Sequence, residues 1–223
     1  MFMTLRSSAA GPKHKTWLDR ARFESAGLIR QLRVGSLVIC TLLVSGCAAR
    51  HYERTQEGHL KGKVVVEWRS PNLFVYKPDT KQPLVFVRKS GDTITPKEMF
   101  TDGGSIPRPF WVLRNYSPWG YGPAFIVHDW LFHMQDCKEE GYDRYSLEDA
   151  ATIMSEVMKT MMESPGFDYG SKTTMYSMYR AVLTQQARDA WVDGKCLIPD
   201  ARTLSVIPDA VFVVEFPPKS GNR

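Results

Sequence analysis

The segment from Thr101 to His133 concentrates the residue types that could perform chemistry. His128 and Asp129 are adjacent in a stretch with helical apolar spacing, a Gly-rich turn with Asp102 precedes them, and Asp149 begins the next helical pattern. A histidine supported by one carboxylate, next to carboxylates that bind a metal ion, can activate water for hydrolysis. We therefore expect these four residues to form a hydrolytic site.

The residue types suggest a role for each side chain. Neighbours on a helix point about 100° apart, so His128 and Asp129 serve adjacent points of one pocket. We expect Asp149, on an antiparallel helix, to accept a hydrogen bond from His128 and to support it as general base. Asp129 and Asp102 would bind the metal, and oxygen ligands favour Ca²⁺ over Zn²⁺. The alternative is structural, with Asp149 serving only the N-terminus of its own helix.

His133 leaves a further choice open. It lies four residues after Asp129, on the same face of the expected helix. Either Asp129 and His133 form half of a transition-metal site, or His133 lies at the polar edge of the helix. The sequence shows no third nitrogen ligand nearby.

The surrounding elements predict an α+β fold. Short runs rich in β-branched and aromatic residues, separated by turn residues, are typical of strands, and a change to helical apolar spacing follows them. We expect a small antiparallel sheet, with N-terminal strands and a C-terminal strand, packed on a three-helix core. The expected strands are residues 64–68, 73–76, 84–87, 93–95 and 211–216, and the expected helices are residues 123–134, 146–161 and 171–191.

The positive net charge comes from the beginning of the chain. The net charge is +5, and residues 1–46 hold seven of the 29 Lys and Arg residues but only two of the 24 Asp and Glu residues. The rest of the chain is formally neutral. A nucleic-acid-binding domain would need a basic face, so we expect no nucleic-acid partner.

The first 46 residues are typical of a secretory signal. A basic region ends at Arg33, and the apolar run 34–44 that follows is short for a membrane span. Residues 44–47, Val-Ser-Gly-Cys, resemble the bacterial lipobox, which implies that Cys47 is lipidated and anchors the chain in a membrane. Ala48 after it implies, by the same resemblance, the outer membrane facing the periplasm. The alternatives are an ordinary signal peptide or a short buried helix.

The remaining chain has the length of one domain. Cys40 would leave with the signal, so Cys137 and Cys196 either pair as a disulfide outside the cytoplasm or are two small buried apolar side chains. The expected boundaries are a signal peptide at 1–46, a tether at 47–62, a single α+β domain at 63–216 and a tail at 217–223.

Three motifs in order carry a family resemblance. Residues 100–108 read FTDGGSIPR, residues 127–132 read VHDWLF, and Glu148-Asp149-Ala150 follows near a helix start. Together they resemble the bacterial and phage family catalogued as domain of unknown function 1353. The resemblance covers about residues 64–183. It implies a fold and a membership but no established activity.

A second resemblance is functional. Residues 101–105 and 128–132 keep polar positions of small secreted prokaryotic phospholipases A2. This resemblance implies that His128 is the general base, Asp149 its orienting partner and Asp129 a Ca²⁺ ligand, with Asp102 as another ligand. It also implies a phospholipid substrate, which suits a protein anchored in a membrane through Cys47.

The match to the phospholipases has departures. Gly104 and Phe125 stand where those enzymes have cysteines, Leu131 and Phe132 replace Gly and Tyr, and the spacing from Asp102 to His128 is longer. The sequence therefore leaves two functions open. One is a Ca²⁺-dependent ester hydrolase, and the other is a non-catalytic envelope lipoprotein that binds a protein or peptidoglycan through aromatic residues at 111–121. A metal-dependent phosphohydrolase would need another helical histidine ahead of the His-Asp pair.

Overall fold

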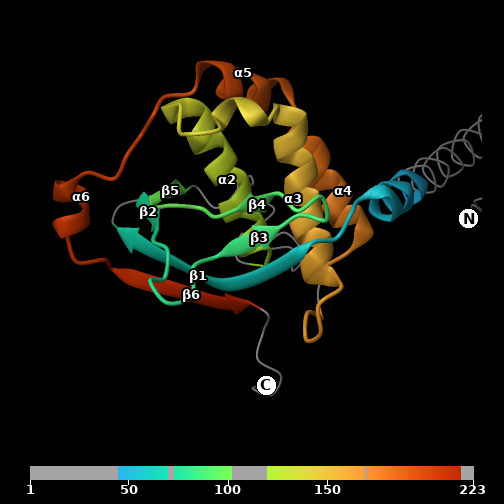
Figure 1. The fold of residues 1–223 in the computed structure, drawn as a ribbon, viewed down its shortest axis with the longest axis horizontal. Coiled ribbons are helices and arrows are strands. Elements are labelled where there is room, and N and C mark those ends of the chain that lie inside the picture. The colour runs from blue at the N-terminus through green and yellow to red at the C-terminus, as the bar shows by residue number, and fades with distance from the viewer. Residues whose placement is uncertain (1–44, 70–72, 102–119, 169, 217–223) are drawn as a thin grey trace, which may run out of the picture. The chain divides into compact units, whose positions relative to one another are not determined.

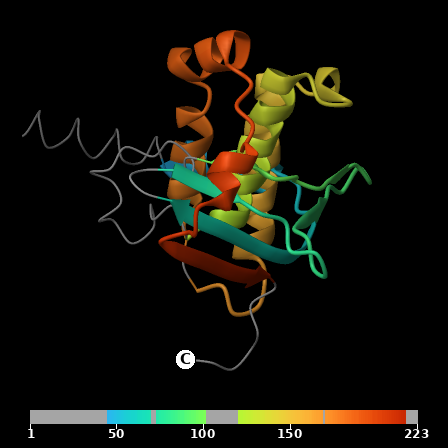
Figure 2. The same ribbon diagram turned by 90° about the vertical axis from the view of Figure 1, so that its left-hand side faces the viewer.

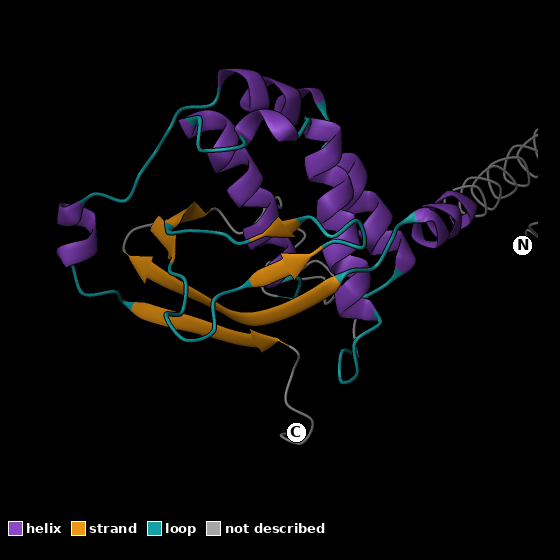
Figure 3. Cartoon of the chain, viewed as in Figure 1, coloured by secondary structure: helices purple, strands orange, loops and turns teal. Residues whose placement is uncertain are grey.

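A curled antiparallel sheet carries the helices on one side. The computed structural model describes residues 45–69, 73–101, 120–168 and 170–216 (Figure 1). In Figures 1 and 2 the helices α2 to α5 stand on one side of the sheet, and β6 is the strand furthest from them. Figure 3 shows the same division by secondary structure. The α+β class predicted from the sequence is confirmed.

Strand β1 (His59–Arg69) organises the sheet. It pairs with β3 (Val85–Val87) over its first residues and with β2 (Leu73–Tyr76) over its last, while β6 (Ala210–Phe216) pairs along Gly62–Trp68. Strand β4 (Thr93–Ile94) pairs with β3 and strand β5 (Met99–Thr101) pairs with β2, so the strand order is β4-β3-β1-β2-β5. The C-terminal strand thus joins the N-terminal strands, as predicted, and β5 is an addition that its three residues were too few to reveal.

Two long helices cover the sheet. Helix α2 (Gly122–Cys137) has Pro123 in its first turn, where the missing N–H costs nothing, and α3 (Leu147–Met162) begins after the cap residue Ser146. Their inner faces bury side chains together with those of β1 and β3, each worth about 1.5–3 kcal/mol. This core includes Val64, Val66, Phe86, Val127, Leu131, Met154, Val157 and Met158.

The predicted third helix is broken in two. Three residues separate the end of helix α4 (Lys172–Ala181) from the start of α5 (Gln185–Asp193). The N–H groups of Leu183 and Thr184 bond to the carbonyls of Arg180 and Ala181, three residues back, and Thr184 is extended. This tightened turn ends the first helix. The predicted third helix contributes to the core only through α4, because α5 has no buried residue, so the three-helix core is not confirmed in detail. The short α6 (Ala201–Ser205) lies between α5 and β6.

The structure also differs from the tether expected at 47–62. Residues 45–54 are helical, and Ala48 and Tyr52 are buried against the domain. Lys159 Nζ donates hydrogen bonds to the carbonyls of Tyr52 and Thr55, and the N–H of Gly58 donates to Thr160. The segment is folded because its few apolar side chains and backbone groups find partners on α3. Within the described ranges no helix has both the length and the apolarity to cross a membrane.

Candidate functional site

A cleft of about 560 Å³ lies between helix α2, the paired strands β2 and β5, and the region where α4 meets α5. The strands contribute mainly apolar walls, and α2 contributes polar groups. The lining residues from β2, β5 and α2 are Leu73, Phe74, Phe100, Thr101, His128, Asp129, Phe132, His133 and Asp136. The second motif of the sequence therefore lies at a hollow in the surface, where it can meet a ligand.

His128 is a buried imidazole at this cleft. The residue is 7% exposed, and neither ring nitrogen has a hydrogen-bond partner among the described residues. Its ring packs against Phe132, with centroids 4.8 Å apart. Buried polar groups are nearly always hydrogen-bonded, so an imidazole with no partner among the described residues is unusual. Its place at a cleft makes His128 a candidate acid or base.

Asp129 is held by the neighbouring strand. The hydroxyl of Thr101, the last residue of β5, donates a hydrogen bond to Asp129 Oδ2. Asp129 Oδ1 lies 3.7 Å from His128 Nδ1, which is too long for a hydrogen bond. It is close enough for attraction to a positive charge that develops on the ring. Thr101 is a site residue that the sequence did not single out, although it begins the Thr-Asp motif.

Asp149 does not contact His128. Its Oδ2 accepts hydrogen bonds from the N–H and the hydroxyl of Ser146, at 2.9 and 2.6 Å, and its own N–H donates to that hydroxyl. This is a capping box at the start of α3, and its hydrogen bonds hold the pKa of Asp149 below the usual range. The predicted His128–Asp149 dyad is wrong, and the structural alternative is what the fold contains. Ser146, three residues before an acid, was the signal for it.

We expect Asp149→Ala to lower the free energy of unfolding by about 1 kcal/mol at neutral pH, since it removes half of the capping box. The lowered pKa means that this stabilisation is present above the unfolded-state pKa and is lost as pH falls through the folded-state pKa. Urea unfolding at pH 7 and at pH 3 measures the change. Glu148→Ala, in the same helical turn, should have a smaller effect. An Asp149→Ala protein with altered His128 ring signals in NMR spectra would contradict this assignment.

The predicted Ca²⁺ site is only partly within the described residues. Asp102, its second proposed ligand, lies outside them. Among the residues that the structure describes, no group of three or more His, Cys, Asp or Glu side chains is arranged to hold a metal ion. Asp129 is thus the one proposed ligand whose position can be stated. The aromatic segment proposed as an interface, 111–121, also lies outside the described residues except for Gly120 and the buried Tyr121.

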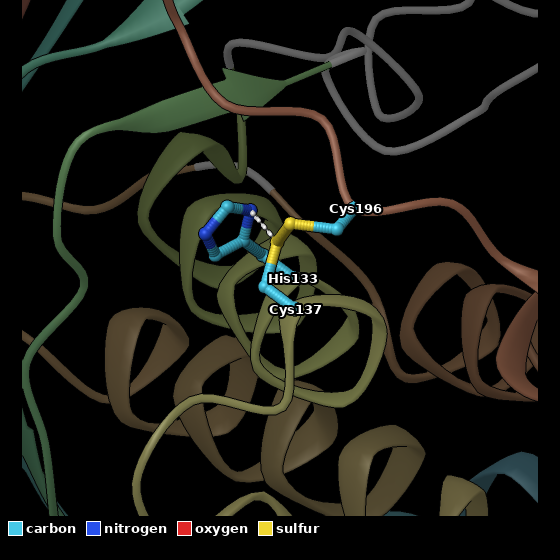
Figure 4. The surroundings of a disulfide bond; sticks show 3 residues. All are labelled: His133, Cys137 and Cys196. Atoms are coloured by element: carbon cyan, nitrogen blue, oxygen red, sulfur yellow. Dashed lines mark hydrogen bonds between the residues drawn. A yellow bond between two sulfur atoms is a disulfide. The ribbon is translucent and has the colours of Figure 1, made fainter.

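His133 lies on the same side of α2, one turn beyond Asp129. Its ring stacks on Trp130, and burial lowers its pKa. Its Nδ1 is 3.8 Å from the Sγ of Cys137, which is joined to Cys196 by a disulfide (Figure 4). The two cysteines therefore take the paired state, one of the two that the sequence left open. Neither contact resembles half of a metal site.

The family model described as "Protein of unknown function (DUF1353)" matches residues 79–182. The family resemblance predicted from the sequence is therefore confirmed for residues 79–182. The DUF1353 segment runs from just before β3 to just after α4, so it contains His128, Asp129, Thr101 and the start of α3. No curated protein and no solved structure matches the chain. The resemblance to secreted phospholipases A2 has no support from these comparisons.

Most of the remaining cleft-lining residues come after the DUF1353 segment. Residues after 182 form a wall opposite α2, which we call the α5 wall. Its cleft-lining residues are Thr184, Gln186, Ala187, Ala190, Lys195 and Leu197. Sequence reasoning missed these residues because their approach to α2 depends on the broken helix and on a disulfide that links distant parts of the chain. Asp136, two turns after Asp129 on α2, could have been found from helical spacing.

Proposed function

We propose that this protein is a lipid-anchored envelope protein whose cleft hydrolyses an ester, with His128 as general base. The observation that carries the proposal is the buried His128 imidazole, which lines the cleft with neither ring nitrogen hydrogen-bonded to a described residue. A cleft with apolar walls and a few polar groups is the usual form of a ligand-binding or active site. The Asp149 dyad is not part of the proposal.

The chemistry follows from the groups at the cleft. A ring nitrogen of His128 takes a proton from water, and the water oxygen attacks the ester carbonyl carbon. Asp129, fixed by Thr101, offsets the positive charge on the ring. The protonated ring then returns the proton to the departing alcohol oxygen. The side chains of Phe74 and Phe132 offer an apolar wall for an acyl chain, which fits a phospholipid substrate.

Ca²⁺ is the cofactor that we propose for this reaction. Asp129 would hold the ion together with Asp102, and the ion would stabilise negative charge on the carbonyl oxygen. The support is the chemistry of the carboxylate beside the imidazole. The proposal needs further oxygen ligands, which backbone carbonyls can supply.

The proposed anchor is the lipidated Cys47, in the outer membrane facing the periplasm. Cys47 is exposed at the start of the helix at 45–54, and its thiol is unpaired in the structure. Ala48 and Tyr52 pack that helix against the domain, so a lipid on Cys47 would hold the domain directly at the bilayer surface. The Cys137–Cys196 disulfide fits an oxidising compartment.

The test is hydrolysis of a fluorogenic phospholipid and of a short-chain fluorogenic ester, each with Ca²⁺ or with a chelator. The Ca²⁺ concentration is about 1 mM, the upper end of the Kd range of extracellular Ca²⁺ modules. We expect cleavage that the chelator suppresses. Cleavage in chelator would remove Ca²⁺ from the proposal and leave His128 as base. No cleavage of either ester would overturn the hydrolase.

One observation favours a second candidate, a non-catalytic lipoprotein that binds a partner. The segment between α5 and β6 exposes large apolar side chains, as binding surfaces do. These are Leu197, Ile198, Val206 and Ile207, each more than half exposed. With Asp149 committed to the helix cap, this candidate takes over if the ester assays fail.

A further inference from the structure

The α5 wall has few non-covalent contacts with the rest of the domain. Helix α5 has no buried residue. The rings of Trp191 and Phe132 make a T-shaped contact with centroids 4.9 Å apart, and Arg188 pairs with Glu148 at 2.7 Å. Both partners of that ion pair are about half exposed, and such pairs contribute little to the free energy of folding. The wall is therefore held mainly by what lies at its two ends.

The two ends of the wall differ in kind. At its start, residues 182–184 interrupt the helix between α4 and α5, and such a break can act as a hinge. At its end, Cys196 is bonded to Cys137 in the last turn of α2. Gly194 passes so close to α2 that a Cβ at this position would lie 2.1 Å from Asp136 Oδ1. The chain is thus pressed against α2 at the point where the disulfide forms.

We propose that the Cys137–Cys196 disulfide is a redox latch that keeps the α5 wall closed over the cleft. Reduction by a dithiol frees Cys196, and the wall swings away from α2 about residues 182–184. Lys195 and Leu197, which line the cleft beside the latch, then leave it. The inference rests on the proposed function only in taking this cleft as the working site, because it concerns access to His128 and not turnover.

The latch opens by thiol–disulfide exchange. A thiolate of the dithiol attacks the sulfur of the exposed Cys196, the protein S–S bond breaks, and Cys137 leaves as a thiolate. It leaves beside His133, whose Nδ1 lies 3.8 Å away and can donate a hydrogen bond to it in the Nδ1–H tautomer (Figure 4). The second thiol of the reductant then releases Cys196. The dithiol ends as its own disulfide, and the protein ends with two thiols.

The test uses the full chain with Cys40→Ser and Cys47→Ser, which leaves Cys137 and Cys196 as its two cysteines. Hydrogen exchange is followed by mass spectrometry with and without dithiothreitol, and diethyl pyrocarbonate measures the reactivity of His128. We expect reduction to speed exchange in 185–197 and to raise the His128 modification rate by about tenfold or more, since disulfides suppress opening by at least that factor. Exchange in α3 should stay the same.

A matched control separates the latch from other effects of the reductant. The Cys137→Ser/Cys196→Ser variant should behave like the reduced protein with or without dithiothreitol. Unchanged exchange in 185–197 on reduction would overturn the latch. Faster hydrogen exchange throughout α2 and α3 would also overturn it, because the disulfide would then stabilise the whole domain and not the α5 wall alone. Both outcomes are independent of whether any ester is cleaved.

Discussion

Replacing His128 with alanine is expected to lower ester hydrolysis by at least about 100-fold, the lower limit of what a general base contributes. The loss should appear in kcat, because the imidazole acts on water and not on substrate binding. The variant should still fold. His128 makes no hydrogen bond to a described residue, so its removal leaves no described polar group without its partner.

Asp149→Ala is the matched control for this experiment. It removes a carboxylate that a dyad would need, but its side chain caps α3 and does not touch His128. We expect it to keep most of the hydrolysis at temperatures where it is folded. Circular dichroism of both variants checks the fold. If His128→Ala kept full activity, His128 would not be the base. Equal losses of activity in the two variants would support a His128–Asp149 dyad.

Replacing Cys47 with serine is expected to remove lipid from the protein and to release it from the membrane fraction. The lipobox-like Val-Ser-Gly-Cys is the reason, together with the exposure of Cys47 at the start of the helix at 45–54. A single acyl chain binds a membrane only marginally, with an association constant of about 10⁴ M⁻¹, so full retention requires the several chains of a lipoprotein. Loss of all of them should leave little of the protein attached.

Metabolic labelling with an alkyne fatty acid, followed by membrane fractionation, measures both effects. The Cys137→Ser/Cys196→Ser variant controls for loss of cysteine in general and should be labelled like the wild type. Equal labelling of wild type and Cys47→Ser would end the proposed lipidation. Labelling that is lost while the protein stays in the membrane fraction would mean that the domain binds the membrane by another surface.

The elements with strong local patterns could be predicted from the sequence. The strand at 73–76 and the helices around His128 and Met154 have clear periodicity, and the structure contains them. The methionines at helical spacing along α3 lie in the core. The position of His128 at a cleft also followed from placing a polar pair on an apolar helix beside a Gly-rich turn.

Features that depend on long-range contacts could not be predicted. The fold of residues 45–58 depends on α3, more than 100 residues later, through bonds such as Gly58 to Thr160. The α5 wall depends on a disulfide across 59 residues. The dyad failed for a local reason. Asp149 had a partner three residues away in Ser146, and a local hydrogen bond forms with less loss of conformational entropy than one between two helices.

The most direct test of the central claim is a crystal structure of the protein with an alkylphosphonate, which mimics the tetrahedral intermediate of ester hydrolysis. We predict a phosphonate oxygen at about 3 Å from a ring nitrogen of His128, a normal hydrogen-bond length, with the alkyl chain against Phe74 and Phe132. A phosphonate bound away from the cleft, or a cleft in which both nitrogens of His128 are hydrogen-bonded to the protein itself, would contradict the claim.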